Sequence, residues 1–320
     1  NLGAAPVMPD VPGLPDARPL TSTSAMELDR LPGHLLVVGG GYVGVEFGQM
    51  FRRFGSRVTI VQRGPQLLAA EDADVSEAVE AVLRDDGIEV LTDAGVASVE
   101  GRSGEAVRVR VRVADGERTL EGSDLLVAVG RAPQTADVGL DAAGVAVDAG
   151  GIIRVNDRLE TTAPGTWALG DCAGTPQQTH ASLDDYRVVK ANVFGPGGRS
   201  TGDRLIPHTV FIDPELGRVG LTERDARARG LDIRVATVPA AVIPRARTLA
   251  ETRGFLKAVV DARSHQVLGF AMLAAGAGEV AAVVQAAMLG RLPYTVLRDG
   301  VIAHPTMAEG LNYLFASEMR

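Results

Sequence analysis

The fold is decided by residues 34–61, which read HLLVVGGGYVGVEFGQMFRRFGSRVTIV. The runs 35–38 and 57–61 are typical of buried parallel strands. A helix is predicted between them, because apolar side chains recur at three- and four-residue steps: Val43, Phe47, Met50, Phe51 and Phe54. Gly55 is the predicted end of this helix. A strand, a glycine-rich turn, a helix and a second strand in this order predict a dinucleotide-binding unit.

The turn after the first strand has the spacing GxGxxG. The first glycine permits a tight turn, the second lets the backbone approach a pyrophosphate, and the third permits close packing of helix on strand. The N-terminus of the helix attracts phosphate charge. We therefore expect the cofactor contacts to include Gly39, Gly41, Tyr42, Val43 and Gly44. The alternative is an ordinary glycine-rich turn between a strand and a helix.

The end of the second strand bears on the choice between NADH and NADPH. An acidic residue there would accept hydrogen bonds from the ribose 2′-hydroxyl and repel a 2′-phosphate. This chain has Gln62 and Arg63 instead. Arg63 is able to pair with a phosphate through two nitrogens, which favours NADPH. In the opposing interpretation Arg63 is a solvated charge and Gln62 serves the hydroxyls of NADH, so both cofactors stay open.

The following residues complete one nucleotide-binding domain, 33–150. Within 71–91 a helix is predicted whose apolar face comprises Val75, Val79, Val82 and Leu83. Residues 106–122 alternate apolar and polar side chains around a central Asp-Gly pair, which predicts a hairpin. The apolar run 124–130 predicts another buried strand. The expected cofactor contacts at its end are Gly130 and Arg131.

The composition excludes several classes of function. The 320 residues carry a net charge of −8 and no long basic run, so we expect no nucleic-acid partner. The longest apolar stretches are too short to span a bilayer, so we expect no membrane partner. The single cysteine, Cys172, excludes an internal disulfide and favours a cytoplasmic location.

Residues 1–32 begin with NLGAAPVMPDVPGLPDARPL, which contains five prolines. This composition is typical of a connector leaving another domain. A merely irregular tail is the alternative.

Several segments together resemble the flavoprotein disulfide reductases, a family that includes dihydrolipoamide dehydrogenase, glutathione reductase and mercuric reductase. The segments are GGGYVGVEFG, LLVAVGRAP, TTAPGTWALGDCAG and HPTMAEG, in this order along the chain. Others resemble the reactive-chlorine-resistance subgroup, whose members reduce copper(II): THASLDDYRVV, VIPRARTLAETRGFLKAVVD and LPYTVLRDGVIAHPTMAEGLNYLF. The resemblance covers essentially the whole chain.

The resemblance implies FAD and NAD(P)H as cofactors and a homodimer as the assembly. It also implies an N-terminal FAD-binding segment with its own GxGxxG, followed by a CxxxxC redox pair. Neither pattern occurs in these residues, which contain one cysteine. We therefore expect the chain to be the C-terminal part of a reductase, and inactive without the remainder.

The resemblance assigns FAD contacts to the third quoted motif and to the segment after it. Within the motif, TWALGDCAG predicts a short apolar strand that ends at Gly170 and Asp171. In the family an aspartate at this strand end bonds the ribityl chain, a role that passes to Asp171, with Gly170 allowing close approach. The helix predicted from Thr179 to Val193 begins with the segment that the family aims at the flavin. Backbone contacts are therefore expected at Thr179 and Ala181, where N–H groups near a helix start favour negative charge.

Four other residues receive an interpretation. The resemblance places Glu46 beside the nicotinamide ribose. Cys172 is interpreted as a packing residue, since reactive thiols lie in exposed, electropositive surroundings. Asp184 and Asp185 point in different directions from a helix, so they are interpreted as solvated charges, and no metal site is predicted.

Residues 207–320 resemble the family's dimerisation domain. Near the end His304 precedes Pro305 and lies five residues before Glu309. In the family this histidine reaches the redox cysteines of the partner subunit, where a pKa near neutrality suits proton exchange with a thiol. Glu309 would accept the other ring N–H, and Pro305 is expected to begin a helix. The alternative is a surface histidine before a helix.

The predicted fold class is α/β, with a Rossmann-like NAD(P)-binding domain, part of an FAD-binding domain and an α+β dimerisation domain. The predicted segments are a connector and FAD-domain tail at 1–32, the NAD(P)-binding domain at 33–150, a second FAD segment at 151–206 and the dimerisation domain at 207–320. The predicted function is part of an FAD-dependent NAD(P)H oxidoreductase. It would pass electrons through FAD and a cysteine pair to a disulfide or a soft metal ion, copper(II) or mercury(II).

Two alternatives remain. One is an NADH oxidase or a ferredoxin-type flavin reductase, although neither needs a histidine from another subunit. The other is a non-catalytic module that binds NAD(P) and dimerises.

Overall fold

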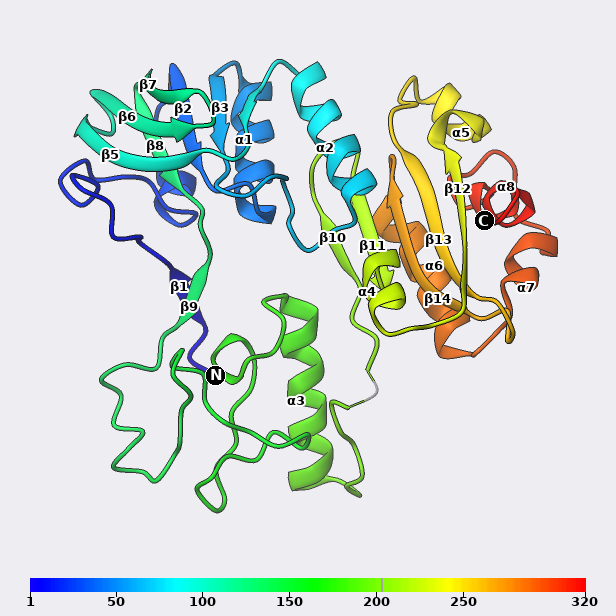
Figure 1. Ribbon diagram of the computed structural model, residues 1–320. Helices are drawn as coiled ribbons and strands as arrows, with labels where there is room; N and C mark the ends of the chain where they lie inside the picture. The colour runs from blue at the N-terminus through cyan, green and yellow to red at the C-terminus, as the bar shows by residue number, and fades with distance from the viewer. Residues whose placement is uncertain (203) are drawn as a thin grey trace. The chain divides into compact units, whose positions relative to one another are not determined.

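The computed structural model describes residues 1–202 and 204–320, which form two compact units (Figure 1). Unit 1 contains Asn1–Met8 and Gly130–Ile206, and unit 2 contains Pro9–Val129 and Pro207–Arg320. One division, at 206/207, coincides with a predicted domain boundary. Residues 130–150 differ from the expectation, because they lie in unit 1 and not with the nucleotide-binding sheet.

Strand pairing explains where residues 130–150 lie. β9 (Arg131–Pro133) pairs antiparallel with β1 (Ala4–Pro6), so the chain joins the N-terminal segment directly after leaving unit 2. Unit 1 also contains the short 3-10 helix η2 (Asp171–Ala173) and α3 (Thr179–Phe194), which confirms the helix predicted over 179–193. A small apolar core includes Cys172, whose side chain is fully buried, as expected of a packing residue.

The first half of unit 2 is built on a four-stranded parallel sheet with the order β4-β3-β2-β8. Its strands are β2 (His34–Val38), β3 (Arg57–Val61), β4 (Glu89–Leu91) and β8 (Asp124–Val127). The helices α1 (Tyr42–Phe54) and α2 (Ala73–Asp85) connect β2, β3 and β4, and η1 (Ser24–Glu27) precedes them. This arrangement confirms the predicted βαβ unit, although β8 ends at Val127 and not at 130.

The two faces of this sheet are covered differently. Alternate strand residues such as Leu35 and Val37 pack against α1 and α2, whereas Leu36 packs against a three-stranded antiparallel sheet. The strands of that second sheet are β5 (Gly95–Arg102), β6 (Ala106–Val113) and β7 (Gly116–Gly122). The predicted hairpin is β6–β7, whose valines point inward while its arginines pair with glutamates on the neighbouring strands.

The buried face of α1 differs from the expected one. Phe54 is 64% exposed, and the face against the sheet is centred on Val45, which is fully buried, and on two glycines. A Cβ at Gly48 would lie 3.0 Å from the Ile60 side chain, so the helix backbone itself approaches the strand. Phe51 of the predicted face is buried, and Phe47 and Met50 pack against the same core, so the prediction is wrong for Phe54 and incomplete on the glycine side.

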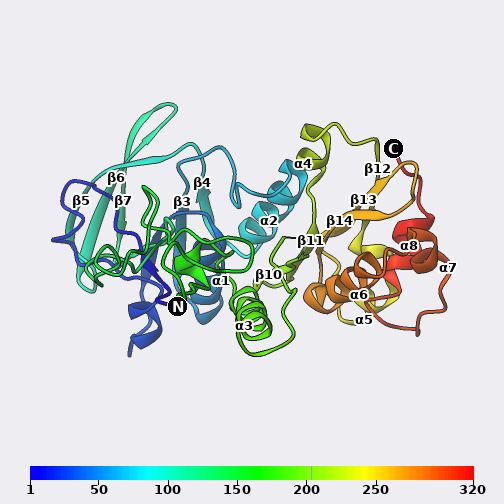
Figure 2. The same ribbon diagram turned by 90° about the horizontal axis from the view of Figure 1, so that it is seen from below.

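The second half of unit 2 is a five-stranded antiparallel sheet with the order β10-β11-β14-β13-β12. Its strands are β10 (His208–Val210), β11 (Leu216–Gly220), β12 (Ile233–Pro239), β13 (Phe255–Asp261) and β14 (Val267–Leu273). The helices are α4 (Glu223–Ala228), η3 (Ala240–Val242), α5 (Pro244–Thr248), α6 (Ala277–Leu289), α7 (Tyr294–Asp299) and α8 (Gly310–Ala316). α6 packs along β11 and β14, and α8 packs on β12 and β13 (Figure 2). No helix in 1–202 or 204–320 is long and apolar enough to cross a bilayer.

α2 belongs to the cores of both halves of unit 2. Its buried valines share one apolar cluster with Ala271 and Leu273 of β14. Just before the helix, Asp72 occupies the N-cap position, yet its carboxylate accepts the amides of Glu223 and Arg224, at 2.9 and 3.0 Å, where α4 begins. The carboxylate therefore caps a helix of the second half.

Cations of the second half bind the acidic residues at both ends of α2. The Lys257 ammonium, of which 4% is exposed, lies 3.2 Å from Asp72, 2.7 Å from Asp74 and 2.9 Å from Glu223. Burial alone would lower the pKa of Lys257, but hydrogen bonds to Asp74 and Glu223 and the nearby negative charges raise it above its ordinary value. The ammonium therefore stays charged although it is buried.

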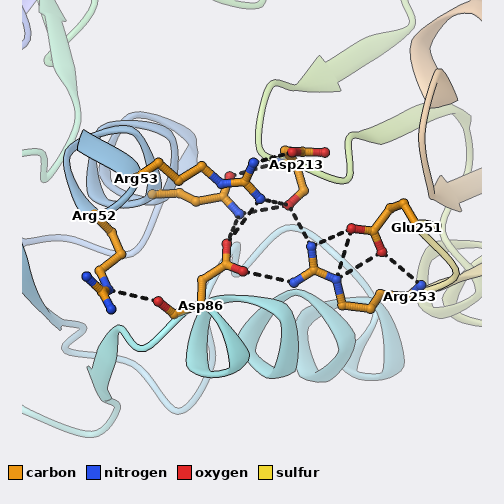
Figure 3. Close-up of polar contacts among 7 residues, drawn as sticks. Arg52, Arg53, Asp86, Asp213, Glu251 and Arg253 are labelled. Carbon is orange, nitrogen blue, oxygen red and sulfur yellow. Dashed lines mark hydrogen bonds and ion pairs between the residues drawn. The ribbon is translucent and has the colours of Figure 1, made fainter. Parts of the chain in front are cut away.

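At the other end of α2, Asp86 lies between α1 and the second half (Figure 3). It accepts hydrogen bonds from Gln49 at 2.8 Å and from Arg253 at 2.9 Å. Gln49 also donates to the carbonyl oxygen of Asp213 at 2.9 Å. Burial tends to raise the pKa of Asp86, but the hydrogen bonds from Arg253 and Gln49 hold that pKa below its usual range.

We predict that Asp86→Asn destabilises the protein by about 1–2 kcal/mol, because Arg253 loses a charged acceptor in a partly buried setting. The melting midpoint should fall by about 2–8 °C, as followed by circular dichroism. Glu80→Gln is the control, since its pair with Arg84 is an exposed contact within one helix and should be worth less than about 0.5 kcal/mol. Equal effects of the two substitutions would contradict the docking role of Asp86.

We predict that the stability difference between wild type and Asp86→Asn depends on pH. A carboxyl group whose pKa is lowered by folding adds stability above its unfolded pKa of about 3.9, and this stability is lost as the pH falls through the lower folded pKa. The gap between wild type and Asp86→Asn should therefore be constant at neutral pH and close in acid below the unfolded value. A gap that widens in acid would contradict the assignment.

Candidate cofactor and acid–base sites

The three glycines of the turn after β2 differ in whether a side chain would fit. Two have no room for a Cβ atom, and the third has open space. Gly39 has φ +110°, and a Cβ there would lie 2.3 Å from the carbonyl oxygen of Ala128. A Cβ at Gly44 would lie 1.9 Å from the oxygen of Gly39. A Cβ at Gly41, by contrast, meets nothing within 4 Å. Gly39 and Gly44 are therefore required by packing, whereas Gly41 leaves open space at the start of α1.

This geometry fits a dinucleotide phosphate. Gly41 is the N-cap residue of α1, and a glycine offers no side chain to satisfy the first amides of the helix. Those amides and the positive end of the helix dipole suit a phosphate group. The next residues, Tyr42 and Val43, are half-buried and form the first turn of α1.

The side-chain amide of Gln62, at the end of β3, forms hydrogen bonds with the backbone through both its oxygen and its nitrogen. Its Oε1 accepts the amide of Gly40 at 3.0 Å, and its Nε2 donates to the carbonyl oxygen of Gln66 at 3.1 Å. The carboxamide thus ties the glycine turn to the loop after β3. Arg63 is exposed beside it. Of the two residues considered for cofactor choice, only Arg63 has its side chain available to a ligand in this conformation.

Tyr42 and Glu46 both face the segment that begins the second sheet. The Tyr42 hydroxyl lies 3.5 Å from Nε2 of His208, and burial, together with the charge of Glu71, raises the pKa of the phenol. Glu46 accepts the amide of Phe211 at 2.8 Å. Burial raises the pKa of Glu46, although this hydrogen bond acts in the opposite direction.

Behind Tyr42 lies a buried polar cluster that the sequence did not indicate. Glu71, of which 1% is exposed, lies 3.2 Å from Nε2 of His208 and 2.8 Å from Arg218. Glu71 precedes α2, whereas His208 and Arg218 lie opposite each other on the paired strands β10 and β11. Glu71 looked like one of several acidic residues before a helix, and no local pattern marks it as buried.

Unit 1 contains the predicted FAD-binding residues. Gly170 has φ +73°, and Asp171 begins η2 directly after it. The carboxylate of Asp171 has no hydrogen-bond or ion-pair partner within residues 1–202 and 204–320, so it remains available to a hydroxyl-bearing ligand. This fits the sugar-like chain that the resemblance assigns to it.

One expectation about α3 needs correction, and one stays a prediction. The amide of Ala181 donates to the carbonyl oxygen of Gln178 at 3.1 Å, and Thr179 is exposed. Flavin contacts at these two residues stay a prediction. Asp185 is fully buried and not solvated. It accepts hydrogen bonds from Thr175 and Arg204, and Asp184 alone lies toward solvent. The backbone N–H of Gly170 supplies a third partner of Asp185.

Gly130 and Arg131 hold the ribbon that enters unit 1. The carbonyl oxygen of Gly130 accepts the amide of Val7 at 2.9 Å, and the Arg131 guanidinium donates to the carbonyl oxygen of Ala4. Both contacts stabilise the β1–β9 pair, which is a structural role for residues predicted to bind a cofactor. Their cofactor contact stays a prediction.

His304 and Glu309 form the pair that the sequence predicted. Nδ1 of His304 lies 2.9 Å from Oε2 of Glu309. The Glu309 side chain is 7% exposed, and the His304 side chain is 67% exposed. The carboxylate therefore binds one ring nitrogen from inside the protein, and the other nitrogen faces outward. Glu309 Oε1 is buried without a hydrogen-bond partner in the part of the chain that the structure describes.

The local backbone differs from the expected one. Pro305 does not begin a helix, because α8 starts at Gly310. The His304–Pro305 peptide is cis. The turn is instead held by Thr306, which donates to the oxygen of Ala303 at 2.7 Å. The chain end is also fixed within the same chain, since Arg320 exchanges two backbone hydrogen bonds with Val235 of β12.

No cluster of three or more His, Cys, Asp or Glu side chains within 1–202 and 204–320 has the arrangement of a metal site. The carboxylates of unit 2 that gather near α2 surround Lys257 and Arg253 instead.

The chain resembles known proteins over nearly its whole length. Residues 2–185 match the family described as "Pyridine nucleotide-disulphide oxidoreductase", and residues 206–314 match its dimerisation domain. The "probable pyridine nucleotide-disulfide oxidoreductase RclA" of Escherichia coli (strain K12) is 43% identical over 318 residues, which are 99% of this chain and 71% of that protein. A mercuric reductase of Bacillus cereus is 36% identical over 309 residues, which are 97% of this chain and 49% of that protein.

A solved structure gives the same result. The Cu(II) complex of the "HOCl-induced flavoprotein disulfide reductase RclA" from Escherichia coli superposes with a TM-score of 0.92 and 43% identity, covering 98% of this chain and 72% of that chain. This chain thus spans about half of the mercuric reductase and less than three-quarters of RclA. Enzymes of the family are oxidoreductases that use FAD and NAD(P)H. The chain belongs to the pyridine nucleotide-disulphide oxidoreductase family.

Proposed function

We propose that this chain supplies the nicotinamide-binding part, one FAD-binding segment and the acid–base histidine of an NAD(P)H-dependent flavoprotein. In the whole protein, electrons would pass to a cysteine pair and from there to a disulfide or a soft metal ion. The observation that carries the proposal is the pair of His304 and Glu309, with Nδ1 and Oε2 2.9 Å apart. A cytoplasmic location, favoured by the single cysteine, suits thiol chemistry.

The His304–Glu309 pair suits proton exchange with a thiol. Glu309 accepts a hydrogen bond from Nδ1–H, which leaves the exposed Nε2 of His304 as the basic nitrogen. The buried carboxylate also stabilises the imidazolium that forms when Nε2 takes a proton from a thiol. The thiolate that remains is the form that attacks a disulfide or binds a soft metal.

The glycine turn before α1 is the proposed binding site of NAD(P)H. We propose that the first amides of α1 bind the pyrophosphate at Gly41, and that Tyr42 and Glu46 border the nicotinamide side. When bound, FAD would supply the two-electron chemistry between nicotinamide and thiols. Arg63 is the exposed cation at the strand end, whereas Gln62 is engaged by Gly40 and Gln66. These contacts favour NADPH over NADH.

The acceptor and the assembly are inferred from the relatives. RclA from Escherichia coli was solved as a Cu(II) complex, and mercuric reductases also match. A copper(II) or mercury(II) substrate would suit the thiolates that His304 generates.

We further propose a homodimer through the C-terminal half of unit 2. Its exposed apolar side chains support this assembly: Val283, Leu289, Leu292, Val296, Val301 and Tyr313.

We predict that His304→Gln in the full-length protein lowers acceptor turnover by about 10²–10⁴-fold, the usual contribution of a general acid–base group. Reduction of the bound flavin by NAD(P)H, followed by stopped-flow absorbance, should keep its wild-type rate. Glu309→Gln should give a smaller loss of the same step.

His265→Asn is the control, because His265 is an exposed histidine of the same half of unit 2 with φ +62°, which asparagine tolerates. It should leave both steps unchanged. Wild-type acceptor turnover in His304→Gln would remove the main support for the proposed function.

We predict that Arg63→Gln raises the dissociation constant for NADPH by about tenfold, because a charged pair with the 2′-phosphate is lost. The constant for NADH should change little. Arg57→Gln is the control, since Arg57 is an exposed arginine at the other end of β3. A fluorescence titration with each nucleotide makes the comparison. Equal values for wild type and Arg63→Gln with NADPH would show that Arg63 is a solvated charge.

We predict that Gly41→Ala preserves the fold but raises the dissociation constant for NADPH by about tenfold or more, because the methyl group occupies the path of the pyrophosphate. Its melting midpoint should match wild type, since φ is −80° and the new Cβ has open space. Gly95→Ala, which also has open space, is the matched control and should bind normally. Unchanged NADPH binding by Gly41→Ala would argue for an ordinary βα turn.

A further inference from the structure

Asp185 is a buried charge that connects three segments of unit 1. It lies on α3 and none of its side chain is exposed. Oδ2 accepts the amide of Gly170 at 2.7 Å and the hydroxyl of Thr175 at 2.6 Å. Oδ1 accepts a hydrogen bond from the guanidinium of Arg204, of which 16% is exposed. Both carboxylate oxygens are therefore satisfied, as a buried charge requires.

The contact to Gly170 controls the direction of the chain at Asp171. Gly170 has φ +73° and ψ −156°, a region that only glycine occupies readily. Its amide points toward Asp185, and the following residue begins η2 with a carboxylate that has no partner among the described residues. The two aspartates thus have opposite roles: Asp185 bonds inward to the backbone, and Asp171 is left for a ligand.

We propose that Asp185 is a positioning residue for FAD, which acts by holding the Gly170–Asp171 turn so that the Asp171 carboxylate meets the ribityl hydroxyls. This inference rests on the proposed function, which assigns the FAD segment to Asp171. Asp185 does not touch the cofactor. Its effect on binding therefore passes through Asp171, which makes it separable from a general effect on stability.

The neighbouring residue provides a matched control. Asp184 lies on the same helix turn and pairs with Arg199 at 2.6 Å and with Arg204 at 3.5 Å. Its hydrogen bonds do not reach Gly170 or Thr175. Asp184→Asn and Asp185→Asn remove the same charge from the same helix, and both touch Arg204, but only Asp185 contacts the turn. Asp185 is also the more buried of the two, so melting midpoints are measured beside FAD affinity.

The test is a double-mutant cycle on FAD affinity in the full-length protein. FAD is removed and titrated back, with its fluorescence as the readout. Asp185→Asn places an amide N–H₂ or a neutral oxygen where Oδ2 accepted two hydrogen bonds. We expect the dissociation constant to rise by about tenfold or more. Asp171→Asn should have a similar effect, and the double variant should bind no more weakly than the weaker single variant, because the two act as one unit.

Three outcomes decide the matter. Additive effects of Asp185→Asn and Asp171→Asn, or an equal effect of Asp184→Asn, would overturn the positioning role and leave only a structural one. If Asp185→Asn does not fold, Thr175→Val replaces it in the same cycle, with additivity again the overturning result. A wild-type protein that binds no FAD would instead refute the proposed function, before any variant is compared.

Discussion

The docking of α2 between the parallel sheet and the five-stranded sheet of unit 2 is the constraint on which the proposed nucleotide site depends. Three basic residues of the second half, Arg218, Lys257 and Arg253, bind carboxylates before, at and after this helix. Buried ion pairs are weak evidence for net stability, because desolvation offsets their attraction. Their effect here is to specify one arrangement: breaking a single pair leaves a buried or partly buried charge, so the parallel sheet and the five-stranded sheet are not free to slide past each other.

The glycine turn also depends on contacts between α1 and the second half of unit 2. Tyr42 begins α1, and its hydroxyl is next to His208, which with Arg218 completes the cluster around Glu71. Glu46, one turn further along α1, accepts an amide from the segment after β10. The N-terminal end of α1, where we propose that the phosphate binds, is therefore supported by the half of the unit that carries His304. The glycine turn and the His304–Glu309 pair lie in the same compact unit.

Much of the fold could be predicted because it depends on local patterns. The run from His34 to Val61 contains every signal of a βαβ unit, and the alternation in β6 is visible by inspection. The His304–Glu309 contact was predicted from the family resemblance of the segment, and the structure contains it. Two local predictions were wrong for physical reasons. Pro305 permits a helix start, but a turn closed by Thr306 follows it and α8 begins only at Gly310. Phe54 has a helical period but lies away from the glycine side of α1.

Asp184 and Asp185 show where sequence reasoning reaches its limit. Both are acidic, both lie on α3, and nothing in composition or periodicity separates them. What separates them is a backbone amide that a glycine with positive φ directs at only one of them. An isolated buried carboxylate is unfavourable, so Asp185 is stable there only because Gly170, Thr175 and Arg204 converge on it. Buried charge of this kind is a property of the assembled site, and the same holds for Glu71.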